Sequence, residues 1–337
     1  MGDRMRRLIK LSNLLLLVFF IPGCIDGEEQ NKGIQEKKHE IVDDKNTSME
    51  TTYHFSYKGQ EFKIISFFDE VMEYATTISE NPELDKKSIY TKYVLVPFKE
   101  QSSINDITLG DPLSPSLEIE QLKKNTNELL ENQEQINKWI EEAILKSAEL
   151  LSGKDTNIYI FPVNPEEWHL INTGGGLSGM TFSESDFLLM IDPSVSEETV
   201  KYAVAHEYHH TVNILHNSVP IEYNILDLTM QEGKADSFAS IVYPETKVIW
   251  KEPLSNDEEA KVLEELSVYG KSMDFIIYDK LVYGNKRKDI PRFSNYKIGY
   301  LITESYIENN PDISILEWTK KGAKEIVAGS KYSALLQ

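Results

Sequence analysis

The strongest constraint in this sequence is residues 205–210, which read Ala-His-Glu-Tyr-His-His. His206 and His210 are four residues apart, so in an α-helix their side chains point only about 40° apart and can reach one metal ion. This H-E-x-x-H pattern is typical of zinc hydrolases, in which the glutamate beside the first histidine, here Glu207, acts as general base. The alternative is an ordinary helix whose histidines are satisfied by hydrogen bonds, and the rest of the chain must decide between the two.

The residues before the motif predict the start of its helix. Ser196 is a favourable N-cap, and two glutamates follow it in the first turn, where the helix dipole favours negative charge. Val200, Val204 and Tyr208 recur on one face, and the two histidines of the motif lie on roughly the opposite face. We expect the apolar face to pack on a core and the histidines to face a second lobe or a cleft.

A catalytic zinc site needs three protein ligands and one position left for water, and two residues compete for the third ligand. Glu232 is separated from His210 by 21 intervening residues and shares a helical face with Asp236. His216 completes a metzincin-like H-E-x-x-H-x-x-N-x-x-H spacing, but in a continuous helix it points about 120° away from His210. It would need a break at Asn213. We favour Glu232, because the metzincin reading leaves Glu232 and Asp236 unexplained, and keep His216 as the alternative.

The motif, residues 225–227 (Ile-Leu-Asp) and residues 231–236 (Gln-Glu-Gly-Lys-Ala-Asp) together resemble a bacterial family of predicted zinc-dependent proteases of the gluzincin type. The likeness extends over much of residues 60–320. It implies one Zn²⁺ ion held by His206, His210 and Glu232, with Asp236 orienting a ligand histidine. Tyr296, in a Y-x-x-G element, looks like the gluzincin tyrosine that stabilises the oxyanion. The equally favoured alternative is that Tyr296 only packs in the core as an aromatic residue.

The N-terminal residues predict export and anchoring. A basic start and an apolar run over residues 11–21 are typical of a secretory signal. The run ends in Ile-Pro-Gly-Cys, which resembles a bacterial lipobox, with a plain secretory signal as the alternative. We expect residues 1–23 to be a lipoprotein signal peptide, Cys24 to be lipidated, and residues 24–50 to form a flexible polar tether. The protein would then be anchored to the outer face of the bacterial cell membrane.

Composition narrows the possible partners and the fold. Cys24 is the only cysteine, so an intrachain disulfide is excluded, and a net charge of −20 without a long basic run argues against nucleic acid. We predict one α+β, zincin-like domain over residues 51–337, with a small mixed sheet, the metal helix and a helical C-terminal lobe. Predicted strands cover 52–57, 62–68, 90–97 and 157–162, with a glycine-rich hairpin over 174–192; predicted helices cover 69–79, 136–153, 257–281 and 295–324; a loop covers 99–116.

The expected activity is hydrolysis of a peptide bond in a peptide or protein substrate. Zinc would activate a water molecule, Glu207 would remove its proton and pass it to the leaving amine, and Tyr296 would assist the oxyanion. The hairpin over 174–192 is placed to hold an extended substrate on its edge strand, although its glycines could equally serve tight turns alone. The alternative function is a catalytically silent surface lipoprotein that uses the fold for binding or assembly.

Overall fold

The computed structural model describes residues 52–102, 104, 113–217 and 223–333, which form a mixed α+β fold around one sheet. The strand order is β1-β2-β3-β5-β4. The central strands β2, β3 and β5 run parallel, and β1 and β4 pair antiparallel at the two edges. The strands are β1 (Thr52–Tyr57), β2 (Gln60–Ser66), β3 (Thr156–Pro162), β4 (Leu177–Thr181) and β5 (Asp186–Ile191). The predicted α+β class is confirmed, whereas the predicted signal peptide, Cys24 and tether lie outside the described residues.

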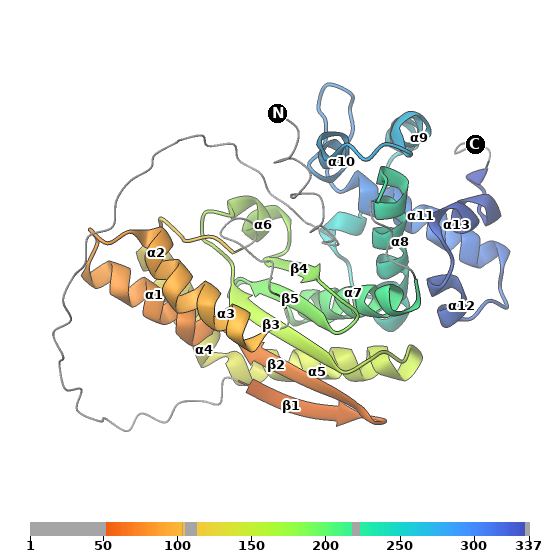
Figure 1. Cartoon of the computed structure of the whole chain (residues 1–337). Helices are drawn as coiled ribbons and strands as arrows, with labels where there is room; N and C mark the ends of the chain where they lie inside the picture. The colour runs from red at the N-terminus through yellow and green to blue at the C-terminus, as the bar shows by residue number, and fades with distance from the viewer. Residues whose placement is uncertain (1–51, 103, 105–112, 218–222, 334–337) are drawn as a thin grey trace, which may run out of the picture.

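The helices lie before, within and after the sheet segments of the chain (Figure 1). The N-terminal helices are α1 (Phe68–Glu80), α2 (Lys86–Tyr90), the π-helical η1 (Thr91–Leu95), α3 (Val96–Gln101), α4 (Ile119–Glu131) and α5 (Gln133–Leu150). The central ones are α6 (Trp168–Thr173), α7 (Glu197–His216) and α8 (Ile225–Val242). The C-terminal ones are the 3₁₀ turn η2 (Ile249–Lys251), α9 (Asn256–Tyr269), α10 (Phe275–Val282), α11 (Ser294–Asn309), α12 (Ile315–Thr319) and α13 (Ala323–Gly329).

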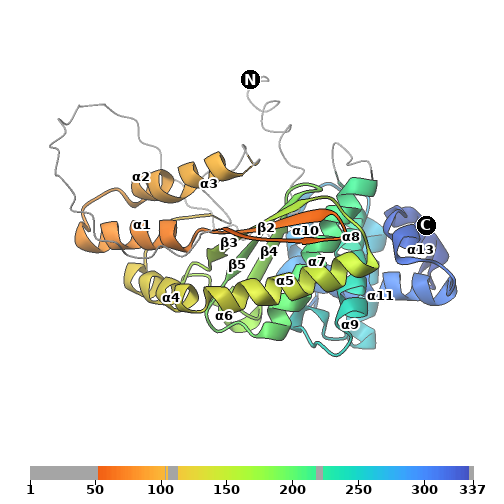
Figure 2. The same ribbon diagram turned by 90° about the horizontal axis from the view of Figure 1, so that it is seen from below.

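The sheet is buried on both faces, because successive side chains of a strand point to opposite sides. On β3, Ile158 and Ile160 belong to a core that includes α5 and α7, whereas Tyr159 and Phe161 belong to a second core beneath α1 to α4. Figure 2 shows α5 on one side of the sheet and α2 and α3 on the other. The near-continuous apolar character of β3 therefore reflects helices on both faces.

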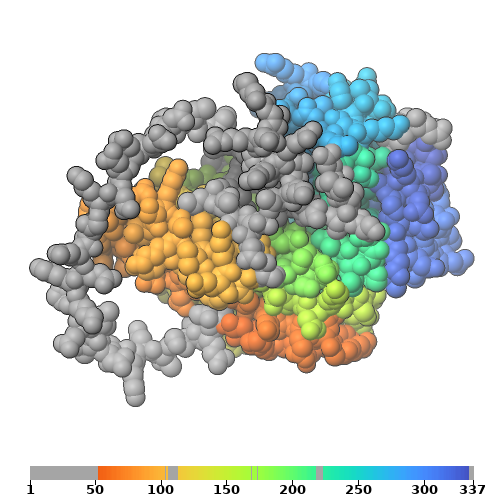
Figure 3. Space-filling model, in the orientation of Figure 1, coloured from red at the N-terminus to blue at the C-terminus, as the bar shows by residue number. Residues whose placement is uncertain are grey.

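The α7 helix, which carries the predicted ligands His206 and His210, lies between two groups of elements. It packs against α5, β4 and β5 of the sheet half and against α8 of the helical half. In the space-filling view the N-terminal elements and the C-terminal helices occupy separate parts of the surface, with the middle of the chain between them (Figure 3). None of the described helices combines the length and apolar character needed to cross a membrane.

One predicted strand is wrong. Residues 90–97 form the end of α2, all of η1 and the start of α3, so the run is helical. Tyr90, Val94 and Phe98 recur every four residues and are buried in the core beneath α1, which is the helical period. Pro97 stands in the first turn of α3, directly after the π-helical η1.

Three other boundaries differ from the prediction. The long helix α5 ends at Leu150, before the glycine at 153 that was expected to cap it. The helical patterns over 257–281 and 295–324 are divided, the first into α9 and α10 and the second into α11, α12 and the start of α13. The predicted loop over 99–116 begins inside α3, and residues 103 and 105–112 lie outside the described part of the chain. The two hairpins, α1 and β3 lie close to where they were predicted.

Candidate metal centre

The three residues predicted as metal ligands lie together in the structure. His206 and His210 come from α7 and Glu232 from α8, all three are buried, and their ligand atoms lie within 4.8 Å of one another. The two histidine Nε2 atoms are 3.0 Å apart, and Glu232 Oε2 lies 3.2 Å from Nε2 of His206 and 3.6 Å from Nε2 of His210. Two nitrogens and one carboxylate oxygen therefore converge on one point.

Helix capping fixes the two helices that carry these ligands. The Ser196 hydroxyl accepts a hydrogen bond from the backbone N–H of Thr199 at the start of α7, as predicted for an N-cap. At the start of α8, Asn224 and Asp227 form a reciprocal capping box. The α7 and α8 helices pack directly on each other, so the ligands face a shared interior.

Asp236, one turn after Glu232 on α8, holds the first ligand in orientation. Its Oδ1 lies 3.0 Å from Nδ1 of His206 and also accepts hydrogen bonds from the Tyr202 hydroxyl at 3.2 Å and Trp250 Nε1 at 3.1 Å. A carboxylate only accepts, so Nδ1 of His206 carries a proton, and Nε2 is the ring nitrogen that would bind a metal after losing its own proton. Tyr202 and Trp250 were missed by the sequence analysis, because neither belongs to a motif.

The charges of the centre fit a bound cation. Burial disfavours a charged His206, yet the carboxylates of Asp236 and Glu232 raise the pKa of that histidine well above its usual range. Burial likewise opposes ionisation of Glu232, but His210 and His206 lower the pKa of that carboxyl to about 2. The carboxylates thus stabilise positive charge where the nitrogens converge. A divalent ion supplies that charge, and the nitrogen and oxygen donors are those that zinc takes in hydrolases.

Glu207 lies beside the ligands, against the edge strand β4. Its Oε2 accepts a hydrogen bond of 2.7 Å from the Thr181 hydroxyl. Its carboxylate also lies directly over Gly179, where an added Cβ would be only 2.3 Å from Oε1. Burial raises the pKa of the Glu207 carboxyl, although His210 and His206 partly oppose this. The side chain is therefore held in one place beside the cluster, and Thr181 is a further contact that the sequence alone did not reveal.

Tyr296 reaches the centre from the first turn of α11. Its ring centroid lies 6.1 Å from that of His206, and its side chain lines the adjacent cavity. Burial and the nearby Glu232 raise the pKa of Tyr296 well above its usual range, so its hydroxyl remains a hydrogen-bond donor. The Y-x-x-G element is thus near the predicted ligands in space.

A close contact between two glycines brings α11 to this position. A Cβ built on Gly233 would lie 2.1 Å from the carbonyl carbon of Gly299, and one on Gly299 would lie 2.2 Å from the carbonyl oxygen of Thr229. Only glycine permits helix backbones to approach so closely. Gly233 directly follows the candidate ligand Glu232, and Gly299 is one turn after Tyr296, so the helix contact lies next to both residues.

The other histidines near the motif lie elsewhere. The α7 helix continues without a break through Asn213 to His216, which is exposed and does not join the cluster. Asn213 Oδ1 instead accepts a hydrogen bond of 2.6 Å from the buried Lys234 ammonium. His209 is buried, stacks on Trp318 and lies 3.2 Å from the Thr319 hydroxyl. It therefore packs against the C-terminal part of the chain.

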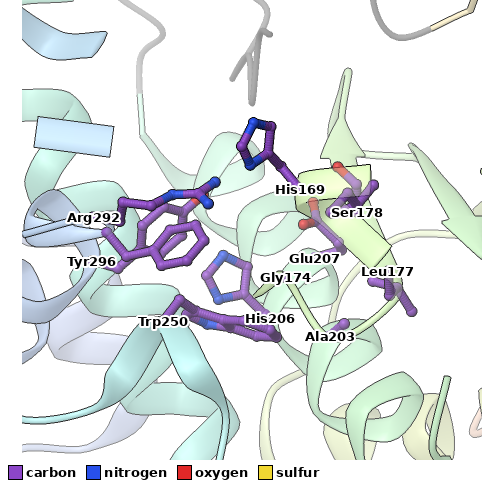
Figure 4. Close-up of a pocket in the computed structure, with 13 residues that line it drawn as sticks. His169, Gly174, Leu177, Ser178, Ala203, His206, Glu207, Trp250, Arg292 and Tyr296 are labelled. Carbon is purple, nitrogen blue, oxygen red and sulfur yellow. The ribbon is translucent and has the colours of Figure 1, made fainter. Parts of the chain in front are cut away.

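A cavity opens beside the candidate ligands and, counting the part continuous with solvent, holds about 560 Å³ of empty space. Figure 4 shows Trp250, Tyr296 and Arg292 on one side of it and Leu177 on the other, with His206 between them. The cavity walls are mainly aromatic and aliphatic, and Glu207 is part of its lining. His169 and Arg292 also line it, although neither residue carried a sequence signal.

Comparison with known proteins agrees with this geometry. No curated protein and no solved structure matches the chain. A family model described as "Predicted Zn-dependent protease (DUF2268)" matches residues 136–328, more than half of the 337 residues. The matched segment runs from α5 into α13. It contains the three candidate ligands and, in addition, Glu207, Asp236 and Tyr296. The chain therefore belongs to this family of predicted zinc-dependent proteases.

Proposed function

We propose that this protein is a zinc-dependent peptidase that hydrolyses peptide bonds with Glu207 as general base. The observation that carries the proposal is the convergence of His206, His210 and Glu232 on one point, with Glu207 buried beside it. A general base serves only turnover, so its presence favours an enzyme over a binding module. The antiparallel edge strand β4 beside the metal helix supports a zincin-like fold of gluzincin type.

The proposed mechanism assigns one task to each residue. The two histidines and Glu232 would hold a zinc ion, which would supply the Lewis acidity that makes water a nucleophile near neutral pH. Glu207 accepts the proton of the attacking water and donates it to the leaving amine as the C–N bond breaks, so no proton is gained or lost overall. The Tyr296 hydroxyl donates a hydrogen bond to the oxygen that gains negative charge. Asp236 holds the first histidine in the orientation that this geometry requires.

The expected substrate is an extended peptide lying along β4. That strand is the edge of the described sheet, and its residues Leu177, Ser178 and Gly179 line the cavity next to Glu207. An extended chain can add to such an edge through backbone hydrogen bonds. The adjoining cavity is mainly apolar, so a large apolar side chain next to the scissile bond fits it better than a charged one.

We also propose that the enzyme works outside the cytoplasm as a lipoprotein anchored through Cys24. The proposal rests on the basic and apolar N-terminal run and on the Ile-Pro-Gly-Cys sequence that ends it. The measurement is metabolic labelling with a palmitate analogue. Wild-type protein is expected to take up label and partition with membranes, whereas Cys24→Ser does neither; equal labelling of both proteins would refute the anchor.

The decisive test of the enzyme compares wild-type protein with Glu207→Gln on a library of peptides, with zinc content measured on the same samples. Replacing the base while keeping the side-chain size is expected to lower kcat about 10²- to 10⁴-fold. Zinc content should stay near one ion per chain in both proteins, because Glu207 is not a ligand. Equal inactivity of the two proteins with zinc bound would instead support the silent binding module.

A further inference from the structure

The least expected contact of the candidate metal centre involves Trp250, which belongs to no sequence motif. Trp250 lies in η2, the short turn after α8, and its indole Nε1 donates a hydrogen bond of 3.1 Å to Asp236 Oδ1. The same oxygen lies 3.0 Å from His206 Nδ1. Trp250 is therefore one hydrogen bond away from the group that orients a metal ligand.

The same side chain forms part of the substrate cavity. Trp250 lines the cavity of about 560 Å³ and lies beside His206 and Tyr296 (Figure 4). Its ring would be 3.9 Å from a Cβ built on Gly175, so it also borders the glycine-rich turn before β4. One edge of the indole thus points to Asp236 while its apolar part faces the space where a substrate side chain would lie.

The surrounding contacts hold η2 in place. The neighbouring Lys251 donates a hydrogen bond to the Ser240 hydroxyl on α8, and its ammonium lies 4.7 Å from the centroid of the Tyr300 ring on α11. Trp250 itself packs edge-on against Tyr202, with ring centroids 5.9 Å apart. The indole thus contacts α7 and α8 directly, and its neighbour Lys251 ties η2 to α8 and α11, which favours a fixed position over a loose surface ring.

We propose that Trp250 is a positioning residue for His206, acting through Asp236, and at the same time a wall of the substrate cavity. An oriented Asp236 keeps His206 in the tautomer and rotation that present Nε2 to the metal. A substrate side chain packed on the indole would then restrict the same ring that orients Asp236. The cavity and the metal centre are linked through this one residue. The second role rests on the proposed peptidase function, whereas the first concerns metal binding alone.

Three matched variants separate these roles. Trp250→Phe keeps an aromatic wall but removes the N–H donor to Asp236. Tyr202→Phe removes the other outer donor and, since Tyr202 is not among the residues that line the cavity, leaves the wall intact. Leu177→Ala enlarges the cavity on the side away from Asp236. Far-UV circular dichroism and thermal unfolding of each protein check that the fold is retained.

The measurements are zinc affinity by chelator competition, the visible absorption spectrum of the Co²⁺-substituted protein, and kcat and KM on one peptide. Trp250→Phe and Tyr202→Phe are each expected to weaken zinc binding about tenfold and to alter the Co²⁺ spectrum. Tenfold is the low end of the loss expected when a residue that supports a metal ligand through hydrogen bonds is removed. Leu177→Ala should raise KM and leave both metal readouts unchanged. Unchanged zinc affinity and an unchanged Co²⁺ spectrum in Trp250→Phe would overturn the positioning role.

The role of Trp250 as a wall of the substrate cavity is tested separately, by KM. Trp250→Ala, which removes both the donor and the wall, is expected to raise KM beyond the value for Trp250→Phe and to weaken zinc to the same extent as Trp250→Phe. Equal KM values for the two variants would overturn the wall role. If wild-type protein binds zinc but cleaves no peptide, the proposed peptidase function fails, while the metal readouts still decide whether Trp250 positions His206.

Discussion

Gly179 on β4 is the residue where a single added methyl group tests the catalytic geometry most directly. A Cβ at this position would lie 2.3 Å from Oε1 of Glu207 and 2.6 Å from its Cδ and Cγ. Ordinary contact begins near 3.4 Å, so the carboxylate must retreat by about 1 Å. That movement also disturbs the 2.7 Å hydrogen bond from the Thr181 hydroxyl. Gly179→Ala should therefore displace the proposed general base and leave the metal ligands in place.

The expected size of the effect follows from that displacement. A misplacement of about 1 Å can cost about 10²-fold in rate, which corresponds to about 2.7 kcal/mol of transition-state stabilisation. Steady-state kinetics on a cleaved peptide should show this loss chiefly in kcat, with zinc content unchanged. Gly322→Ala is the matched control, because a Cβ there meets only Glu325 Oε2 at 3.7 Å, an ordinary contact. It should retain wild-type kinetics.

A double-mutant cycle shows whether the loss acts through the base. In a Glu207→Gln background the general base is already gone, so adding Gly179→Ala should lower kcat little further. Independent effects would instead multiply. Wild-type kcat in Gly179→Ala, or a full additional 10²-fold loss in the double variant, would refute the argument that Gly179 makes room for the Glu207 carboxylate.

Two further predictions concern the ligand set and the helix contact. Glu232→Ala is expected to lose zinc, whereas His216→Ala should retain it, because Glu232 lies with the two histidines and His216 does not. The measurement is the zinc content of each protein after dialysis. Zinc retained by Glu232→Ala and lost by His216→Ala would restore the metzincin-like alternative. Gly299→Ala is expected to destabilise the fold by about 1–3 kcal/mol or more, because its methyl group meets backbone that no side-chain rotation can clear. Thermal unfolding measures this, and an unchanged Tm would contradict the close packing of α8 and α11.

The grouping of the candidate metal ligands could be predicted because much of their geometry is local. His206 and His210 are four residues apart, and helical periodicity alone places them on one face. Glu232 and Asp236 repeat the same spacing on the next helix, and the structure brings Glu232 to within 3.2 Å of His206. Continuation of the helix through Asn213 was also predictable from its apolar surroundings. These inferences require only the period of a helix and the chemistry of the side chains.

The remaining contacts depend on tertiary packing that no short pattern encodes. Thr181 is 26 residues before Glu207, and Trp250 is 14 residues after Asp236, yet each pair is hydrogen-bonded. The strand predicted over 90–97 was wrong for a related reason. Apolar β-branched residues fit a strand and a buried helix equally well until the packing partner is known. In the folded chain these residues pack against α1, and their buried side chains recur with the period of a helix.

The positions of the glycines suggest how the site achieves its precision. Gly179 lets the edge strand approach the Glu207 side chain, and Gly233 and Gly299 let α8 and α11 touch through their backbones. Each lies within three residues of a group that lines or forms the centre, namely Ser178, Glu232 or Tyr296. Larger residues at these points would separate the elements by more than the roughly 0.5 Å tolerance that a catalytic arrangement allows. Residues 232–236 (Glu-Gly-Lys-Ala-Asp) and the Y-x-x-G element at 296–299 therefore form the two sides of one helix contact. Each carries its proposed functional side chain near the glycine that positions it.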